Sequence, residues 1–219
     1  MSSLPESTLF DDLSEADRIM IARFARRRKA HDELIVRRGE KASHLFVLVK
    51  GRVKYYRVTK KGEEVLLWWL KRGDAVGLSA LLKDAPEYIG TAEPIGRCEL
   101  LEWTHSDISK LIPAYPQLCQ NAFRMTLHYL SHYTARHEAI ISDTAEQRLG
   151  NVLMSLAHRV GRPTPTHVEV EITNEQLGKL ADVGLFTATR LLSRWQRRGA
   201  IAKKRGKILI LAPEKLPID

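Results

Sequence analysis

Cysteine is scarce in this chain of 219 residues, which has only Cys98 and Cys119. The two lie far apart and form no CxxC pair. A disulfide framework needs several cysteines and a four-thiolate iron–sulfur cluster needs four, so one chain can build neither. We expect two free thiols and no iron–sulfur cluster.

Long hydrophobic runs are missing as well. No segment approaches the roughly 20 consecutive apolar residues that span a bilayer. The stretch MSSLPESTLFDDLSEADR lacks the basic and then apolar order of a secretion signal. The sequence therefore predicts a cytoplasmic protein that does not enter a membrane.

Sequence motifs of common catalytic sites are absent too. The chain has no G-x-S-x-G elbow, no P-loop and no H-E-x-x-H pair. Its carboxylates include no pair that stands out from ordinary surface charge. We therefore expect no enzymatic activity.

Positive charge, in contrast, is in excess. The chain has 35 lysines and arginines against 26 acidic residues, for a formal net charge of +9. Such an excess favours an anionic partner, either nucleic acid or a membrane surface. Because no long basic amphipathic helix supports membrane binding, double-stranded DNA is the preferred partner.

Residues 173–197 have the pattern of two short helices around a tight turn. Thr173 and Gln176 fit a capping box, in which side chains bond the free amides of a helix start. In the turn Asp182-Val183-Gly184 we expect the glycine to adopt a positive φ. Apolar residues then recur at helical spacing and predict a second helix packed on the first; they are Ala188, Leu191, Leu192 and Trp195.

The other side of the second helix is polar and basic. Thr187, Arg190, Arg194 and Arg197 follow one another at spacings of three, four and three residues. Hydroxyl and guanidinium groups projecting from one helix face suit the major groove of DNA. The predicted DNA contacts are Thr173, Phe186, Thr187, Thr189, Arg190, Arg194, Arg197, Lys203, Lys204 and Arg205.

A basic hairpin follows this helix. We expect Gly199 to end the helix, residues 200–202 and 207–211 to form strands, and residues 203–206 to form the tip. From residue 182 to residue 211, eight basic residues stand against one acidic residue, so the segment carries +7 of the net charge. A charge run alone is just as typical of a solvated helix face. The cap, turn, apolar stripe and hairpin together favour a winged helix-turn-helix.

Residues 31–105 alternate short apolar segments with basic-glycine pairs. Gly39, Gly51, Gly62 and Gly73 lie 12, 11 and 11 residues apart, with segments such as LFVLV, VKYYRV and EVLLWWL between them. We interpret each pair as a turn in an antiparallel β-roll, a fold that often encloses one ligand. The fold class is therefore α+β.

Three helical segments are expected in addition to the two helices of the helix-turn-helix. Residues 14–30 predict a leading helix whose basic run, residues 26–29, is solvated surface. Residues 113–142 predict one long helix, and residues 143–160 predict a helix that opens the DNA-binding domain. The expected domains are a sensor roll, residues 1–112, the long helix, residues 113–142, and the winged domain, residues 143–219.

The long helix has two apolar stripes, and one roll can cover only one of them. The second stripe can pair with a copy of itself, which predicts a homodimer. One stripe contains Phe123, Leu127 and Leu130, and the other contains Ala122, Met125, Tyr129, His132 and Arg136.

The order of helix, β-roll, long helix and winged helix-turn-helix resembles the Crp/Fnr family of bacterial transcription regulators over almost the whole chain. Residues 143–211 carry the most specific similarity. The resemblance implies an effector sensor coupled to a promoter-binding module, with RNA polymerase as a further partner.

The sensor departs from the family's cyclic-nucleotide pattern. Members that bind cyclic nucleotides place Gly-Glu and, some ten residues later, Arg-Ser against the ribose and the cyclic phosphate, whereas this chain has Gly77-Leu78 and Tyr88-Ile89. A buried phosphate without such partners would be costly, so cyclic AMP is disfavoured. The cysteine cluster of the oxygen-sensing branch is also missing.

Other effectors stay open, including none at all. His132 and Tyr133 stand where the nucleotide-binding branch faces its ligand, and His128 and His132 share a helix face that could serve haem or a metal. Packed interface residues are the commoner role, so neither is favoured. The candidate effector pocket comprises Trp68, Gly77, Leu78, Tyr88, Ile89, His132 and Tyr133.

The second helix of the helix-turn-helix, which is the recognition helix in the family, departs from the family pattern as well. Many members begin it with Arg-Glu and place a second Arg four residues after the Glu, whereas this chain has Leu185, Phe186 and Arg190. Arg190 alone carries over and suits a bidentate contact with guanine. Phe186 or Leu185 either touches a thymine methyl group or packs under the wing.

Overall fold

The computed structural model describes residues 4–218 and divides the chain into two compact units, Met1–Leu130 and Ser131–Asp219. Residues 1–3 and residue 219 lie outside the described range. The first three belong to the stretch in which no secretion signal is expected, and residue 219 is the end of the expected winged domain. The boundary between the units falls within the long helix.

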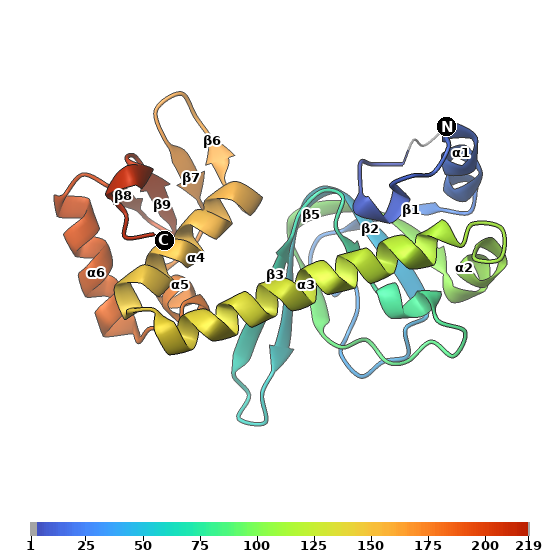
Figure 1. Ribbon diagram of the computed structural model, residues 1–219, viewed down its shortest axis with the longest axis horizontal. Coiled ribbons are helices and arrows are strands. Elements are labelled where there is room, and N and C mark those ends of the chain that lie inside the picture. Colours follow the sequence, from blue (N-terminus) through green and yellow to red (C-terminus); the bar gives the residue numbers. More distant parts are fainter. Residues whose placement is uncertain (1–3, 219) are drawn as a thin grey trace. The chain divides into compact units, whose positions relative to one another are not determined.

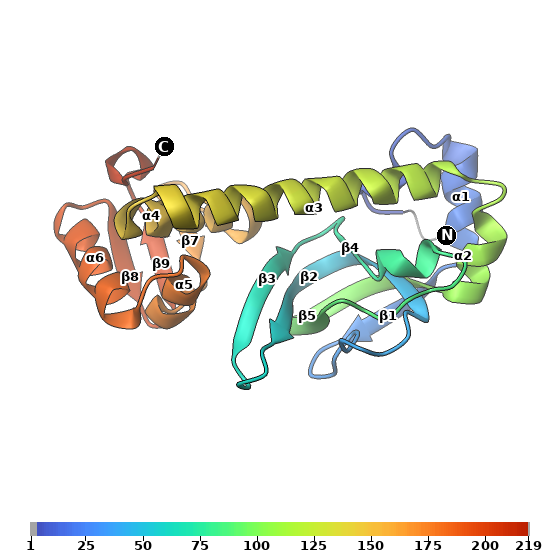
Figure 2. The ribbon, with the colours of Figure 1, turned by 60° about the horizontal axis from the view of Figure 1, so that its bottom comes forward.

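The first unit is built on an antiparallel sheet with the order β1-β5-β2-β3, in which β4 also pairs with β2. Strands β2, β3 and β5 run side by side, and the amino-terminal half of α3 lies over them (Figure 2). The elements are η1 (Thr8–Phe10), α1 (Glu15–Arg23), β1 (Arg26–Ala30), β2 (His44–Val58), β3 (Glu64–Leu70), β4 (Ala75–Val76), η2 (Leu78–Leu81), β5 (Thr91–Thr104), α2 (His105–Leu111) and the start of α3 (Gln117–Ser142).

The second unit joins a helix-turn-helix to a small antiparallel sheet with the order β6-β7-β9-β8 (Figure 1). The predicted winged helix-turn-helix is confirmed, and so is the single long helix. After the end of α3 come α4 (Ala145–Val160), β6 (Arg162–Pro163), β7 (Val168–Val170), α5 (Asn174–Leu180), α6 (Leu185–Arg197), β8 (Ile201–Lys204), β9 (Lys207–Ile210) and η3 (Pro213–Lys215).

The leading helix is shorter than the sequence suggested. It ends at Arg23, and the basic run Arg26–Ala30 is strand β1, paired with β5 along the edge of the sheet. Most of this run is exposed, but the Arg28 guanidinium lies over the Phe46 ring, 5.4 Å from its centroid, and donates to the carbonyl of Leu34. Pairing with a strand some seventy residues away in sequence leaves no local signal.

The segments LFVLV and VKYYRV are not separate strands joined by a turn. They form one strand, β2, and the register with β5 shifts on both sides of Lys50. Gly51 has a φ of +99°, and a Cβ there would lie 2.6 Å from the Cys98 sulfur and 2.7 Å from the Arg97 carbonyl oxygen. Glycine is therefore needed at this bulge, because β2 lies too close to β5 there for any side chain.

The two stripes of α3 have distinct environments. Ala122 and Met125 are buried in the core of the first unit, whereas Phe123, Leu127 and Leu130 are exposed. Ala122, Met125 and the partly buried Tyr129 of the second stripe therefore pack on the roll. Phe123, Leu127 and Leu130 form the stripe left for other contacts.

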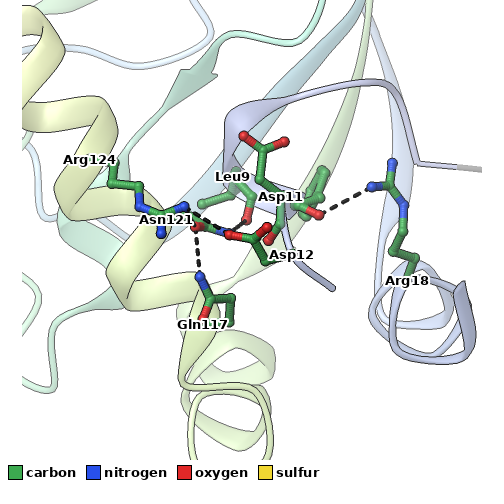
Figure 3. Close-up of polar contacts among 8 residues, drawn as sticks. Leu9, Asp11, Asp12, Arg18, Gln117, Asn121 and Arg124 are labelled. Carbon is green, nitrogen blue, oxygen red and sulfur yellow. Dashed lines mark hydrogen bonds and ion pairs between the residues drawn. The ribbon is translucent and has the colours of Figure 1, made fainter. Parts of the chain in front are cut away.

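Asn121 fastens the amino-terminal segment to the start of α3 (Figure 3). Its side chain is fully buried, and its amide donates to the carbonyls of Leu9 and Asp11 at 3.1 and 2.7 Å. Its carbonyl oxygen accepts from Gln117 at 3.0 Å and from Arg124 at 3.4 Å. Every hydrogen-bonding position of this buried amide is used, so the contact fixes one orientation of the segment.

Asn121→Asp should destabilise the first unit by about 2 to 4 kcal/mol, because a carboxylate would face two carbonyl oxygens that it cannot bond. Urea unfolding monitored by circular dichroism measures the loss. Gln120→Glu, at an exposed position on the same helix, is the matched control and should change stability little. Equal stability of the two variants would contradict the role given to Asn121.

Candidate nucleic-acid interface

The buried side of α6 anchors this helix in the second unit. Ala188, Leu191, Leu192 and Trp195 are all buried, as their spacing predicted. Gly178 on α5 permits the close approach, since a Cβ there would lie 2.7 Å from the Val183 carbonyl oxygen and 3.3 Å from the Ala188 Cβ. Both helices of the motif are therefore held in one packing arrangement.

The outward face of α6 differs from the face that spacing alone suggested. Phe186, Arg190 and Arg197 are exposed, and a helical rotation of about 100° per residue places them within about 40° of one another. This direction is opposite the buried stripe. Thr187, Thr189 and Arg194 are half-buried and lie on the flanks.

Arg194 is held by an acidic residue on α4. Its guanidinium donates to the Glu146 carboxylate at 3.0 Å, and the same carboxylate accepts the indole N–H of Trp195 at 2.9 Å. Because Trp195 is fully buried, Glu146 satisfies a polar group that has no access to water. Glu146 thus ties α4 to the recognition helix α6.

Arg148, also on α4, holds the turn between α5 and α6. Its guanidinium donates to the carbonyls of Ala181 and Asp182 in that turn and to the carbonyl of Asp143, which precedes α4, at 2.8 to 3.0 Å. The sequence indicated neither Arg148 nor Glu146, because their bonds to the helix-turn-helix reach residues more than thirty positions away. Helix α4 itself begins at a capping box formed by Thr144 and Gln147.

The positive φ of this turn is at Asp182, with φ +52°, and not at Gly184, whose φ is −58°. The expectation for Gly184 is therefore wrong. Aspartate tolerates the left-handed region better than most residues. Here the two bonds from Arg148 to the carbonyls of Ala181 and Asp182 also hold the backbone.

Thr173 caps α5 as predicted. Its hydroxyl accepts the amide of Gln176 at 3.1 Å, while the Gln176 side chain accepts the amide of Thr173 at 2.9 Å. Thr173 is exposed, so the hydroxyl proton can still be donated outward.

The wing is a tighter hairpin than expected. Lys203 and Lys204 belong to β8, so the tip is Arg205-Gly206 alone. Lys204 and Arg205 are exposed, whereas the Lys203 ammonium donates to the Ser193 hydroxyl of α6 at 3.2 Å. The wing is thereby fastened to the recognition helix.

Lys207 of the wing is neutralised within the domain. Its ammonium lies 2.6 Å from Glu169 and 3.6 Å from Glu171. The hydrogen bond to Glu169 raises the pKa of Lys207, and the same bond lowers the pKa of Glu169. Lys207 therefore contributes less positive field than Lys204 or Arg205, which have exposed side chains.

Several of the predicted effector residues act as core residues of the first unit. Trp68 is buried with its ring edge-on to Tyr129, at a centroid distance of 5.2 Å. The Tyr88 hydroxyl donates to the His44 carbonyl and accepts the His44 amide, both at 3.0 Å. Tyr88 therefore uses its polar atom to join the roll's own backbone.

The remaining candidates have different environments. Gly77 lies beside Tyr88, but Leu78 is half-buried and Ile89 is 71% exposed. His132 and Tyr133 belong to the second unit.

Neither a metal cluster nor a membrane span is found in the part of the chain that the structure describes. Within residues 4–218, no group of three or more histidines, cysteines or carboxylates could hold a metal ion. No helix in that range is long and apolar enough to cross a bilayer.

Glu146→Ala should destabilise the second unit by about 2 kcal/mol, because the indole N–H of Trp195 would be buried without an acceptor. Glu146→Gln keeps an acceptor and should cost less. The indole N–H resonance of Trp195, followed by NMR during urea unfolding, reports this unit. Glu175→Ala removes an exposed carboxylate paired with Lys179 and is the control. If Glu146→Ala behaves like Glu175→Ala, Glu146 does not hold Trp195.

Comparisons with known proteins agree with this geometry. Residues 26–115 match the cyclic nucleotide-binding domain family, and residues 147–217 match the Crp-like helix-turn-helix domain family. The chain is 24% identical over 186 residues to the cAMP-activated global transcriptional regulator CRP of Salmonella typhimurium, covering 81% of this chain and 84% of that protein. It is 24% identical over 182 residues to the fumarate and nitrate reduction regulatory protein of Yersinia pestis, covering 82% and 71%.

Solved structures show the same architecture. The c-di-GMP responsive global regulator CLP of Xanthomonas campestris superposes with a TM-score of 0.76 at 17% identity, covering 90% of this chain and 99% of that one. The chain therefore shares the fold of that structure over most of its length. This chain belongs to the Crp/Fnr family and is a DNA-binding transcriptional regulator of that type.

Proposed function

We propose that α6 enters the major groove of operator DNA and that Arg190 reads a base there. The observation that carries this proposal is the exposed face of Phe186, Arg190 and Arg197, which points away from the buried stripe. An arginine on such a face can make a bidentate contact with the O6 and N7 atoms of guanine.

The wing supplies contacts of a different kind in this proposal. Lys204 and Arg205 are exposed at and beside its tip, where they can bind phosphate oxygens without regard to sequence. Arg194 is paired with Glu146, so we assign it to phosphate contact from the flank rather than to base reading.

The protein acts as a homodimer in this proposal, paired through α3. Phe123, Leu127 and Leu130 are 63%, 48% and 56% exposed, which is unusual for three apolar side chains on one helix face. The spacing of four and three residues is that of a coiled-coil seam and continues through Thr134 and His137 to Ile141. Two recognition helices would then meet two half-sites.

We propose that cyclic AMP is not the effector. Leu78 offers no carboxylate to the ribose, and the Tyr88 hydroxyl is already bonded to His44. These residues lack the carboxylate and the guanidinium that cyclic-nucleotide-binding members of the family place at these positions. Haem is not favoured either.

Arg190→Ala should relax base preference at one position in each half-site, since a lost bidentate contact with guanine costs about 1 to 3 kcal/mol. Lys204→Ala should weaken all sequences alike and reduce the salt dependence of binding. Fluorescence anisotropy with a selected operator, its point variants and a random duplex separates the two effects. Lys83→Ala, in the first unit, controls for loss of one positive charge. Identical behaviour of Arg190→Ala and Lys204→Ala would refute the division of roles.

Cyclic AMP should neither raise the thermal stability of the protein nor be needed for operator binding. Isothermal titration calorimetry and binding assays with and without the nucleotide measure both. Micromolar affinity for cyclic AMP would overturn this part of the proposal.

A further inference from the structure

Phe186 is not packed against any core within the residues that the structure describes, 4–218. Its side chain is 91% exposed, the highest value among the large hydrophobic residues that the structure describes. Leu185, its neighbour in the first turn of α6, is 47% exposed and lies on the flank. The sequence left open whether Phe186 packs under the wing, and its exposure shows that it does not.

The position of Phe186 on α6 is that of a DNA-reading residue. It lies four residues before Arg190, so the two side chains are one turn apart on the same outward face. The face therefore presents an aromatic ring beside a guanidinium. Since Arg190 suits a base edge, the ring next to it would meet the edge of a neighbouring base pair.

The major groove offers one kind of apolar group to such a ring. Base edges there carry hydrogen-bond donors and acceptors, apart from the methyl group on C5 of thymine. A ring pressed against a polar edge would strip water from it without replacing the hydrogen bond, which is unfavourable. A ring against a methyl group removes apolar surface from water, which is favourable.

We propose that Phe186 is a specificity-determining residue that selects a pyrimidine carrying a 5-methyl group at one position in each half-site. This inference rests on the proposed function, in which α6 enters the major groove. It names the methyl group, rather than a polar base atom, as the feature recognised beside the Arg190 contact. Because 5-methylcytosine carries the same methyl group at the same place, cytosine methylation at this position should strengthen binding.

The test uses the full chain and an operator selected from random duplexes. Each thymine of that operator is replaced in turn by deoxyuridine, which removes only the methyl group, and the dissociation constant is measured by fluorescence anisotropy. Wild type should bind roughly three- to five-fold more weakly when one half-site position is changed, and about ten-fold or more when both are. Phe186→Ala should be indifferent to the same replacement.

A second arm places cytosine or 5-methylcytosine at the identified position. Wild type should prefer 5-methylcytosine by a similar three- to five-fold factor, and Phe186→Ala should not discriminate. Leu185→Ala is the matched control, because it removes a neighbouring apolar side chain from the flank, and it should keep the wild-type preference. Because Phe186 is exposed, its replacement by alanine should leave the thermal unfolding midpoint unchanged.

Each outcome bears on a definite claim. If every thymine tolerates deoxyuridine, or if Phe186→Ala keeps the penalty, the methyl-reading role is wrong while the DNA-binding proposal stands. If Leu185→Ala loses the penalty and Phe186→Ala does not, the reading residue is Leu185 and this assignment is overturned. If no sequence is selected from the random duplexes, both the proposed function and this inference fail.

Discussion

Burial of one side of α6 is the constraint on which the DNA-binding surface depends. Exposed arginines do not by themselves fix the position of a helix, because solvated charge does not specify packing. Here Ala188, Leu191 and Leu192 lie in the core, and the indole of Trp195 is fixed by the Glu146 carboxylate. The outward direction of Arg190 follows from that anchoring.

The first turns of α4 extend this constraint to the rest of the motif. Glu146 holds α6, while Arg148 bonds both the turn before α6 and the carbonyl of Asp143. Asp143 follows directly on α3, the helix to which we assign dimerisation. Arg148 therefore links the backbone at Asp143, directly after α3, to the turn that precedes α6.

Local patterns predicted those parts of the structure that local chemistry determines. The Thr173–Gln176 capping box, the buried stripe of α6 and the long helix α3 each follow from spacing within a few turns. The roll was also predictable in kind, because its regular glycines mark sites of positive φ. At Lys50-Gly51, however, the glycine makes a bulge within β2 and not a turn, since the need for it comes from Cys98 on another strand.

The errors share one physical cause, which is partners distant in sequence. The basic run after α1 is a strand because β5 pairs with it. The positive φ is at Asp182, whose carbonyl accepts a hydrogen bond from Arg148, a residue 34 positions away. The exposure of individual side chains likewise could not be predicted from the sequence. Only the structure shows that Phe186 points outward and that the Tyr88 hydroxyl bonds the backbone of the roll.

The central claim is that two copies of this chain, paired through α3, set two recognition helices into DNA. Hydroxyl-radical footprinting of the full chain on its selected operator tests it most directly. The account predicts two protected tracts whose centres lie about one helical turn, roughly ten base pairs, apart, related by the symmetry of an inverted repeat. One protected tract, or uniform protection along the duplex, would contradict it.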